Sequence, residues 1–453
     1  MSIPDWSYDE SYYAALTKGT GLEIRTDPVK GKGLFATKAF KTGESALAET
    51  ALCCTQNVDE VLRQVPVCMH CLVSLETPQR IVSRVTSDKT LANALPHVDL
   101  FPRKSKIYCR NRPEGCTAMF CSSRCADEAW RQYHFVGCVG NMTEDGKAAY
   151  IEFVQENWEQ GGVDYSDTHF FAFRFLCIAL SRHRLQGLPL NVAYAPVAQL
   201  IRAPLKKFNF TFLLGDEESV EAKYNSFIKF KANPEEHPAV VEASKELKKD
   251  TMLEKGHKML QRILSWNASE QEFFTIVRWS ELLGAVLLNG QERTPNSPFT
   301  EYNEFLQKFP DGESQWKALK KKLGGSSVVN KCHSSSKGQG IYTIGACFNH
   351  SCEPNLQILY SEENDETLVA VCIRDIAPGD ECTISYINEE MRYIERHQQL
   401  FEHYLFDCLC AKCVKDRETT VVPVAVPPSS ATGAPSPPQP SQESSTSVDA
   451  PDA

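Results

Sequence analysis

Three short stretches in the C-terminal half decide the fold. They read Asn349-His-Ser-Cys-Glu-Pro-Asn355, Gly379-Asp-Glu-Cys-Thr-Ile-Ser-Tyr386 and Tyr404-Leu-Phe-Asp-Cys-Leu-Cys-Ala-Lys-Cys413. Taken singly, each has an ordinary interpretation: a polar turn, a strand residue in a core, and an incomplete metal site. Their order and spacing, together with Gly31-Lys-Gly-Leu-Phe35 near the start of the chain, favour one shared site instead.

A second group of candidate metal ligands lies between residues 68 and 138. Its members come in close pairs: Cys68, Cys71, Cys109, Cys116, Cys121, Cys125, His134 and Cys138. Zinc takes four thiolate or imidazole ligands in a tetrahedron, and a tight turn can aim two side chains at one ion. The spacing therefore predicts two closed, structural zinc sites, with Cys109 as the least secure ligand. A set of buried free thiols is the less favoured interpretation.

The composition bounds the class of protein. A chain of 453 residues has room for several domains. Its 18 cysteines, without a secretory signal, indicate metal binding more than disulfides. The net charge of -10 opposes nonspecific nucleic-acid binding and weakly favours basic partners. No apolar run approaches the ~20 residues of a membrane-spanning helix, so we expect the protein in the nucleus, the cytoplasm or both.

Hydrophobic patterning predicts an α+β fold. Short strands alternate with turns in residues 22–50, and helical spacing runs from about residue 145 to 322, with a buried helix at 279–288. A further helix is expected at 391–406. Residues 423–453 are rich in Pro, Ser and Thr, which predicts a disordered tail. Later strands are expected at 341–344, 356–360 and 367–373, the last two as a hairpin around an acidic turn.

The quoted stretches resemble the SET domain of protein lysine methyltransferases. The cysteine pairs that end in His134-x3-Cys138 resemble the MYND zinc finger, although an insertion separates the first pair from the second. A MYND finger inserted inside a SET domain is typical of the SET-and-MYND family. Within that family the chain is most similar to the fifth member, through Leu95-Pro-His97, Asn289-Gly-Gln291 and an ending soon after the last cysteines.

The resemblance implies a division of the chain and a pairing of the metal ligands. The implied parts are an N-terminal segment (1–21), the SET N-terminal part (22–67), the MYND finger (68–138), a helical insertion (139–280), the catalytic SET part (281–400), a post-SET zinc segment (401–420) and the tail (421–453). The implied zinc sites are Cys68/Cys71/Cys121/Cys125, Cys109/Cys116/His134/Cys138 and Cys352/Cys408/Cys410/Cys413. The third ion would pin the C-terminal segment over the cofactor site.

The same resemblance implies S-adenosylmethionine as the methyl donor. The implied cofactor contacts are Lys32, Gly33, Leu34, Asn289, Asn349, His350, Tyr386 and Phe406. The glycines around residue 32 would let the backbone approach the amino-acid end of the cofactor. Asn349 and His350 would hold the adenosine, Asn289 the amino-acid end, and Phe406 would stack on adenine. An ordinary core phenylalanine is the alternative for Phe406.

The chemistry of methyl transfer makes Tyr386 the catalytic candidate. A lysine with a pKa of about 10.4 must first lose a proton, which costs ~4.6 kcal/mol at pH 7. A narrow apolar channel favours the neutral amine because burial lowers the pKa of a lysine. An aromatic hydroxyl can orient that amine without adding a full charge. Direct in-line transfer then needs positioning and desolvation, with no covalent enzyme intermediate.

The leading hypothesis is therefore a protein-lysine N-methyltransferase that acts on histone tails or other basic proteins. We expect a monomer, with a peptide partner at the finger as a further hypothesis. The alternative from another class is a protein-interaction scaffold or transcriptional co-regulator with a vestigial SET core, but no SET motif is damaged. A DNA-binding zinc protein is less favoured, because it needs a basic face that a net charge of -10 does not offer globally. The basic residues between Arg103 and Arg112 could contact nucleic acid or an acidic peptide, but a solvated charged face is the favoured interpretation.

Overall fold

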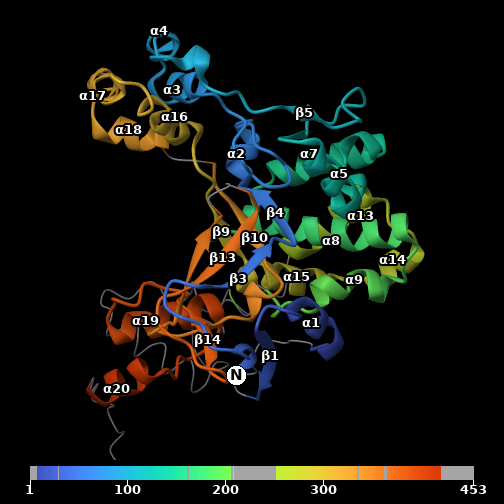
Figure 1. The fold of residues 1–453 in the computed structure, drawn as a ribbon. Coiled ribbons are helices and arrows are strands. Elements are labelled where there is room, and N and C mark those ends of the chain that lie inside the picture. Colours follow the sequence, from blue (N-terminus) through green and yellow to red (C-terminus); the bar gives the residue numbers. More distant parts are fainter. Residues whose placement is uncertain are drawn as a thin grey trace, which may run out of the picture.

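The computed structural model describes residues 8–28, 30–160, 163–205, 208, 251–333, 336–361 and 365–419. The predicted tail and part of the predicted helical stretch lie outside the described residues. Within them, helices are mixed with short sheets, as predicted for an α+β fold. Figure 1 shows the sheets near the middle, helices packed along their right-hand side, and a separate helical lobe at the upper left.

One sheet joins the N-terminal motif to the two later ones. Its strand order is β1-β2-β14-β11, in which β11 runs parallel to β14 and the other pairs are antiparallel. Phe35 pairs with Glu381, and Asn349 pairs with Thr383. Residues more than 300 positions apart in the chain thus become neighbours. The strands are β1 (Leu22–Asp27), β2 (Gly31–Ala36), β11 (Asn349–His350) and β14 (Glu381–Ile384).

Two three-stranded sheets complete the strand-rich part. One has the order β12-β13-β3, and its β12–β13 pair confirms the predicted hairpin. The other has the order β4-β10-β9. Their strands are β3 (Ser45–Thr50), β4 (Cys53–Gln56), β9 (Gln291–Arg293), β10 (Gly338–Ile341), β12 (Leu356–Tyr360) and β13 (Thr367–Cys372).

The strand predicted at 341–344 is wrong in its position, because β10 ends at Ile341. The backbone N–H groups of Ile344 and Gly345 donate to the half-buried carboxyl group of Glu49, at 2.9 and 2.7 Å, and not to a neighbouring strand. A 3-10 turn follows at Gly345–Cys347. A side-chain acceptor from β3 therefore replaces the ladder and bends the chain toward the Asn349 motif.

Helix α8 (Ser166–Gln186) is the centre of the helical part. Every residue from Thr168 to Ser181 is buried, as expected for a helix that other elements enclose on all sides. It ends at Gly187, whose φ of +68° suits glycine. The predicted helix at 279–288 is confirmed as α15, with Trp279 buried. The helices of this part are α7 (Glu144–Gln155), α8, α9 (Leu190–Ala198), α13 (Thr251–Leu264), α14 (Ala268–Phe273) and α15 (Ile276–Asn289).

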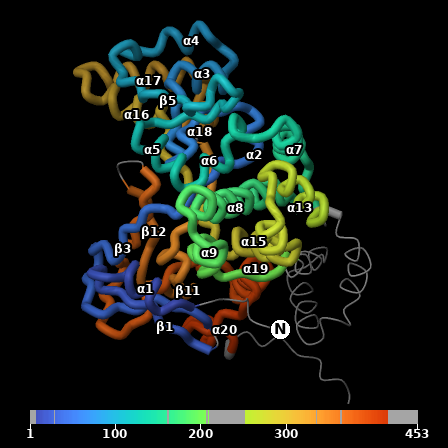
Figure 2. Tube along the Cα trace, turned by 90° about the vertical axis from the view of Figure 1, so that its right-hand side faces the viewer, coloured from blue at the N-terminus to red at the C-terminus, as the bar shows by residue number. Residues whose placement is uncertain are grey.

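The upper lobe is built from two segments that the sequence prediction placed in different domains. The insertion between Cys71 and Cys109 of the predicted finger packs against residues 298–333, and together they form a hydrophobic cluster of their own. His97 stacks on Phe309 with ring centroids 4.0 Å apart, and the hydroxyl of Tyr302 donates to the carbonyl of Pro96. Figure 2 shows the same lobe at the top from a second direction. Its helices are α3 (Pro78–Thr86), α4 (Lys89–Asn93), α16 (Pro298–Leu306), α17 (Gly312–Lys322) and α18 (Ser326–His333).

Short elements make up the rest of the described chain. The helix predicted at 391–406 is confirmed as α19, and no helix among the described residues is long and apolar enough to cross a membrane. The remaining elements are α1 (Glu10–Thr17), α2 (Val58–Leu62), η1 (Val98–Leu100), β5 (Ile107–Tyr108), β6 (Met119–Phe120), α5 (Ser123–Ala129), η2 (Trp130–His134), α6 (Phe135–Gly137), η3 (Val139–Asn141), β7 (Glu159–Gln160), β8 (Val163–Asp164), η5 (Gly345–Cys347), α19 (Tyr393–Tyr404) and α20 (Ala411–Thr419).

Candidate active site and metal clusters

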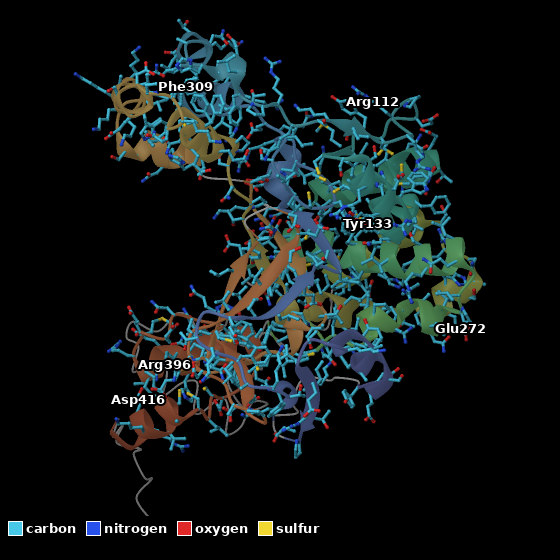
Figure 3. All side chains as sticks on the ribbon, viewed as in Figure 1. Arg112, Tyr133, Glu272, Phe309, Arg396 and Asp416 are labelled. Atoms are coloured by element: carbon cyan, nitrogen blue, oxygen red, sulfur yellow. The ribbon has the colours of Figure 1, made fainter. Side chains whose placement is uncertain are left out.

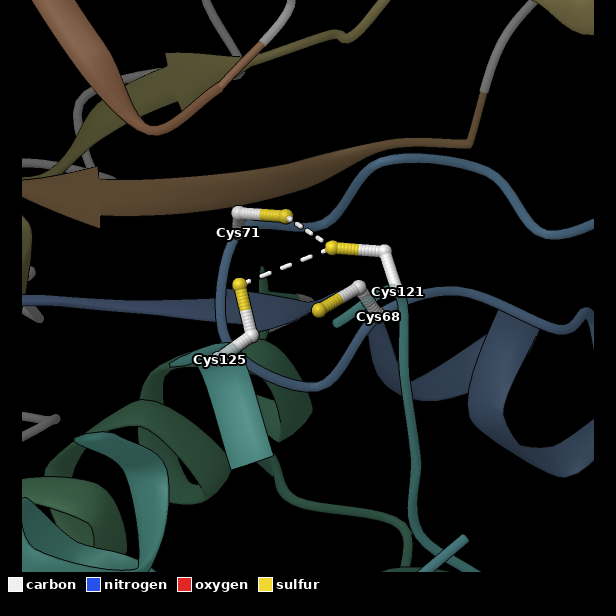
Figure 4. A group of neighbouring side chains, drawn as sticks. All are labelled: Cys68, Cys71, Cys121 and Cys125. Atoms are coloured by element: carbon white, nitrogen blue, oxygen red, sulfur yellow. Dashed lines mark hydrogen bonds between the residues drawn. The ribbon is translucent and has the colours of Figure 1, made fainter. Parts of the chain in front are cut away.

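The first cysteine cluster lies where a turn meets the start of α5. Cys68 and Cys71 flank the turn, Cys121 follows β6, and Cys125 is in the first turn of α5 (Figure 4). The sulfur of Cys121 lies 3.7 Å from that of Cys71 and 3.5 Å from that of Cys125. Two sulfurs bound to one tetrahedral zinc, each at about 2.3 Å, are about 3.8 Å apart. The group therefore has the size of a zinc site.

The second cluster contains the ligand that the spacing left least secure. The sulfur of Cys109 lies 3.7 Å from that of Cys138 and 3.2 Å from Nε2 of His134, so Cys109 is within the group. Cys116 completes it, with its sulfur 3.5 Å from the same nitrogen. A sulfur and a nitrogen on one tetrahedral zinc are about 3.6 Å apart. All four ligand atoms lie within 4.8 Å of one another.

The third cluster joins two stretches of the C-terminal half, residues 349–355 and residues 404–413. Cys352 meets Cys408, Cys410 and Cys413, with 3.5 Å between the sulfurs of Cys352 and Cys413. The buried guanidinium of Arg396 points an N–H at the sulfur of Cys413, 3.7 Å away, and pairs with Asp416 at 2.6 Å (Figure 3). A cation beside the cluster compensates part of the negative charge that four thiolates would carry.

Asn349 is held by a residue that the sequence analysis did not single out. Its side-chain Nδ2 donates to Oε1 of Glu381 at 2.8 Å, and Lys30 donates to the other carboxylate oxygen at 2.7 Å. Gly33 lies against this pair: a Cβ there would be 2.9 Å from Nδ2 of Asn349 and 3.0 Å from Oε1 of Glu381. The absence of a side chain at Gly33 therefore keeps open a small cradle beside the Asn349 amide.

Tyr386 is anchored at both its backbone and its hydroxyl. Its N–H donates to Nδ1 of His350 at 3.0 Å, and its hydroxyl donates to the carbonyl of Phe348. Tyr404 and Phe406 flank the ring, with centroids 4.7 and 6.3 Å from that of Tyr386. Burial raises the pKa of Tyr386, so its hydroxyl keeps its proton at neutral pH.

His350 connects Tyr386 to the third cluster. Burial lowers the pKa of His350 to about 4, so the ring is neutral at physiological pH. Since Nδ1 accepts the N–H of Tyr386, the ring proton is on Nε2, which lies 3.3 Å from the sulfur of Cys352. An imidazole that donates to a cluster thiolate has a fixed orientation. The position of Tyr386 is thus coupled to the cysteine cluster through one ring.

The side chains of two of the predicted cofactor residues make hydrogen bonds within the protein. The buried ammonium of Lys32 donates to the hydroxyl of Tyr13 at 2.8 Å and to the carbonyl of Gln199. Burial lowers the pKa of Lys32. Asn289 donates to the carbonyls of Ile201 and Ala285 and accepts the N–H of Ile201. Both side chains thereby hold residues 199–201.

The structure therefore divides the predicted cofactor residues into two groups. Gly33 and Asn349 lie together, as do His350, Tyr386 and Phe406, whose rings are within 6.3 Å of one another. The side chain of Leu34 is fully buried in a hydrophobic core, which leaves only its backbone for a ligand. The sequence did not point to Glu381, which orients Asn349, or to Tyr404, which packs on Tyr386. Both lie inside the quoted stretches, but glutamate and tyrosine are common residue types that carry no specific signal there.

Comparison with known proteins agrees with this geometry. The family model of the SET domain matches residues 225–387. The chain is 26% identical over 415 residues to the mouse protein-lysine N-trimethyltransferase SMYD5, which covers 88% of this chain and 87% of the relative. Its human counterpart is 27% identical, with the same coverage. The Arabidopsis thaliana histone-lysine N-methyltransferase ATXR2 is 26% identical, over 75% of this chain and 68% of that protein.

The matched fold and the assembled motifs define a SET-domain enzyme. More narrowly, the chain is similar to the SET-and-MYND protein-lysine methyltransferases, and the predicted likeness to the fifth member of that family is confirmed.

Proposed function

We propose that the chain transfers a methyl group from S-adenosylmethionine to the neutral amine of a lysine in a basic protein segment, by direct in-line displacement. The single observation that carries the proposal is the anchoring of Tyr386. Its hydroxyl and the carbonyl of Phe348 are hydrogen-bonded to each other, next to three further aromatic rings. The hydroxyl oxygen of Tyr386 and the carbonyl oxygen of Phe348 could orient a lysine amine and a polarised methyl group without placing a full negative charge beside them. The aromatic rings would provide the apolar wall of the channel.

The cradle at Gly33 supports a cofactor site at Asn349. A Cβ would fill the space beside the Asn349 amide, and glycine leaves it free. Asn349 and His350 would hold the cofactor, with Phe406 near its ring system, and Lys32, Leu34 and Asn289 would shape the wall behind it. The bound cofactor would supply the methyl group on a sulfonium. The chain itself would orient the amine through Tyr386 and exclude water with its aromatic rings.

Three structural zinc ions belong to the same proposal. The two clusters between residues 68 and 138 would form a MYND-type finger, and the Cys352 cluster a post-SET site. Each cluster has four protein ligands and no open position, so its ion would stabilise and not catalyse. The third ion would fix Phe406 two residues before Cys408.

The substrate and the setting are proposed from charge and likeness. A net charge of -10 suits basic segments, and histone tails are basic. One relative carries histone-lysine methyltransferase in its name, which favours action in the nucleus beside the cytoplasm. We retain the domain boundaries at 22–67, 68–138, 139–280, 281–400 and 401–420, a monomeric state and a peptide partner at the finger as parts of this proposal.

Replacing Tyr386 by phenylalanine tests the proposed mechanism. Methyl transfer to a basic protein panel, followed by intact mass, should fall by about 10²-fold or more, with the dissociation constant of the cofactor changed only a few-fold. Tyr302→Phe is the matched control, because it also removes a buried hydroxyl that donates to a carbonyl, but in the upper lobe. Full activity in Tyr386→Phe would remove Tyr386 from the mechanism. No thermal shift of the parent with cofactor would favour the scaffold alternative.

A further inference from the structure

A group of three metal-binding side chains lies outside the three cysteine clusters. It contains His70 from the turn between Cys68 and Cys71, Glu128 from α5, and Glu366 from the residue before β13. Nε2 of His70 is 3.2 Å from Oε2 of Glu128 and 3.8 Å from Oε1 of Glu366. The group therefore joins the finger to the β12-β13-β3 sheet of the SET part.

The hydrogen bonds around His70 fix which nitrogen carries the proton. The hydroxyl of Tyr133 donates to the carbonyl of Met69, so its oxygen accepts a hydrogen bond from Nδ1 of His70, 3.2 Å away. With Nδ1 directed at Tyr133, Nε2 faces the two carboxylates. The three ligand atoms lie within 4.8 Å of one another, so a cation placed between them would contact all three.

The carboxylate of Glu366 is unusual because it is buried and one of its oxygens has no hydrogen-bond partner among the described residues. The residue is 3% exposed, and its Oε2 has no hydrogen-bond partner among the described residues. Its backbone carbonyl accepts the N–H of Ala51 and the hydroxyl of Tyr342, so the backbone is held in the sheet. A buried carboxylate oxygen without a partner is costly. This orphan oxygen is an observation independent of the cluster itself, and it too requires a positive group.

The ion pairs present do not satisfy this requirement. Arg124 is 3.5 Å from Glu366 and 4.0 Å from Glu128, and its side chain is 65% exposed. Charge-assisted N–H···O bonds are about 2.7–2.9 Å long, so neither Arg124 nor a protonated His70 makes a close bond to these carboxylates. Nitrogen and oxygen ligands on one tetrahedral zinc are about 3.3–3.4 Å apart, which the 3.2 and 3.8 Å separations bracket.

We propose that His70, Glu128 and Glu366 bind a fourth zinc ion, which ties the finger to the SET sheet. Imidazole with carboxylates is a donor set that suits zinc. Three protein ligands leave one position for water, in contrast to the closed cysteine clusters. The fourth ion is a clamp between parts of the chain that lie about 240 to 300 residues apart.

The number of zinc ions per chain tests the proposal. The full chain is dialysed against a zinc-buffered solution and weighed by native mass spectrometry. We expect four zinc ions in the parent and three in Glu128→Ala and in Glu366→Gln. Asp127→Asn is the matched control, because Asp127 is the neighbouring acid on α5 and pairs at the surface with Arg110; it should keep four. Three ions in the parent, or four in either variant, would overturn the proposal.

A second measurement covers the case in which a variant does not fold. Anomalous diffraction at the zinc edge from crystals of the parent should show a peak within bonding distance of Nε2 of His70 and of oxygens from Glu128 and Glu366. Zinc peaks at the cysteine clusters and none between these three side chains would refute the fourth site, whatever the variants do.

Discussion

Replacing Glu381 by alanine should weaken the binding of S-adenosylmethionine by about ten- to a hundredfold. The carboxylate of Glu381 is the acceptor that orients the Asn349 amide, at 2.8 Å, and it is itself paired with Lys30. A hydrogen bond to a charged group contributes about 1.5–3 kcal/mol, and each 1.4 kcal/mol is a factor of ten in a dissociation constant. The effect should fall mainly on the cofactor because Glu381 makes no hydrogen bond to Tyr386 among the described residues, whereas it bonds Asn349 directly.

The assay is calorimetric titration of the full chain with cofactor, combined with steady-state kinetics at saturating cofactor. The Michaelis constant for the cofactor should rise while the maximal rate stays within a few-fold. Glu381→Gln keeps an acceptor for Asn349 and loses only the charge, so its affinity should be intermediate. Glu390→Ala, an exposed acid nine residues along the chain, should bind as the parent does. A dissociation constant of Glu381→Ala within twofold of the parent would refute the orienting role.

Three further changes have expected outcomes. Gly33→Ala should weaken cofactor binding at least tenfold in the same titration, because the added Cβ would push on the Asn349 amide at 2.9 Å; parent-like affinity would contradict the cradle. Cys410→Ser should lower cofactor affinity in the same titration while leaving the stability of residues 68–138 close to that of the parent. Limited proteolysis followed by mass spectrometry measures the stability of these residues separately from that of the C-terminal segment. Glu49→Gln should flatten the pH dependence of stability. Burial raises the pKa of Glu49 to about 7 against the opposing backbone donors, so its contribution is complete below the ordinary carboxyl pKa and is lost as the pH rises to about 7. Over this range the free energy of unfolding of the parent should fall by about 3 kcal/mol more than that of Glu49→Gln. Urea unfolding of the parent and of the variant at about pH 5 and pH 8 measures this difference.

The grouping of the candidate metal ligands could be predicted from the sequence, whereas the partners of the candidate cofactor residues could not. Residue type and spacing identified the eight candidates between residues 68 and 138, and the resemblance to the MYND finger implied how they interleave, as the structure groups them. Even Cys109, the doubtful ligand, lies in its group. Asn289 and Lys32, by contrast, have common side chains with many possible partners. Their partner, residues 199–201, carries no motif, and only the folded chain shows that both side chains hold it.

The upper lobe shows a second limit of sequence reasoning. The insertion between Cys71 and Cys109 and residues 298–333 have no local pattern that relates them, although their buried apolar side chains form one shared cluster. Their contacts are between segments about 200 residues apart, such as Tyr302 with Pro96. The difference between the strand predicted at 341–344 and the observed β10 has a similar cause. The side chain that accepts the N–H groups of Ile344 and Gly345 belongs to Glu49 of β3. Long-range contacts decide both features, and neighbouring residues do not encode them.

The three cysteine clusters differ in what their loss should affect. Only the Cys352 cluster is in contact with a residue that also bonds Tyr386, because His350 has Nδ1 on the Tyr386 N–H and Nε2 beside Cys352. Protonation or oxidation of Cys352 would remove the acceptor that fixes the ring, and a rotated imidazole could no longer accept the Tyr386 N–H. Loss of a metal ion bound at this cluster would therefore disturb Tyr386, the proposed catalytic residue, directly. The finger clusters have no such ring between them and Tyr386 in the described structure, so their loss reaches the site only through the general stability of the fold.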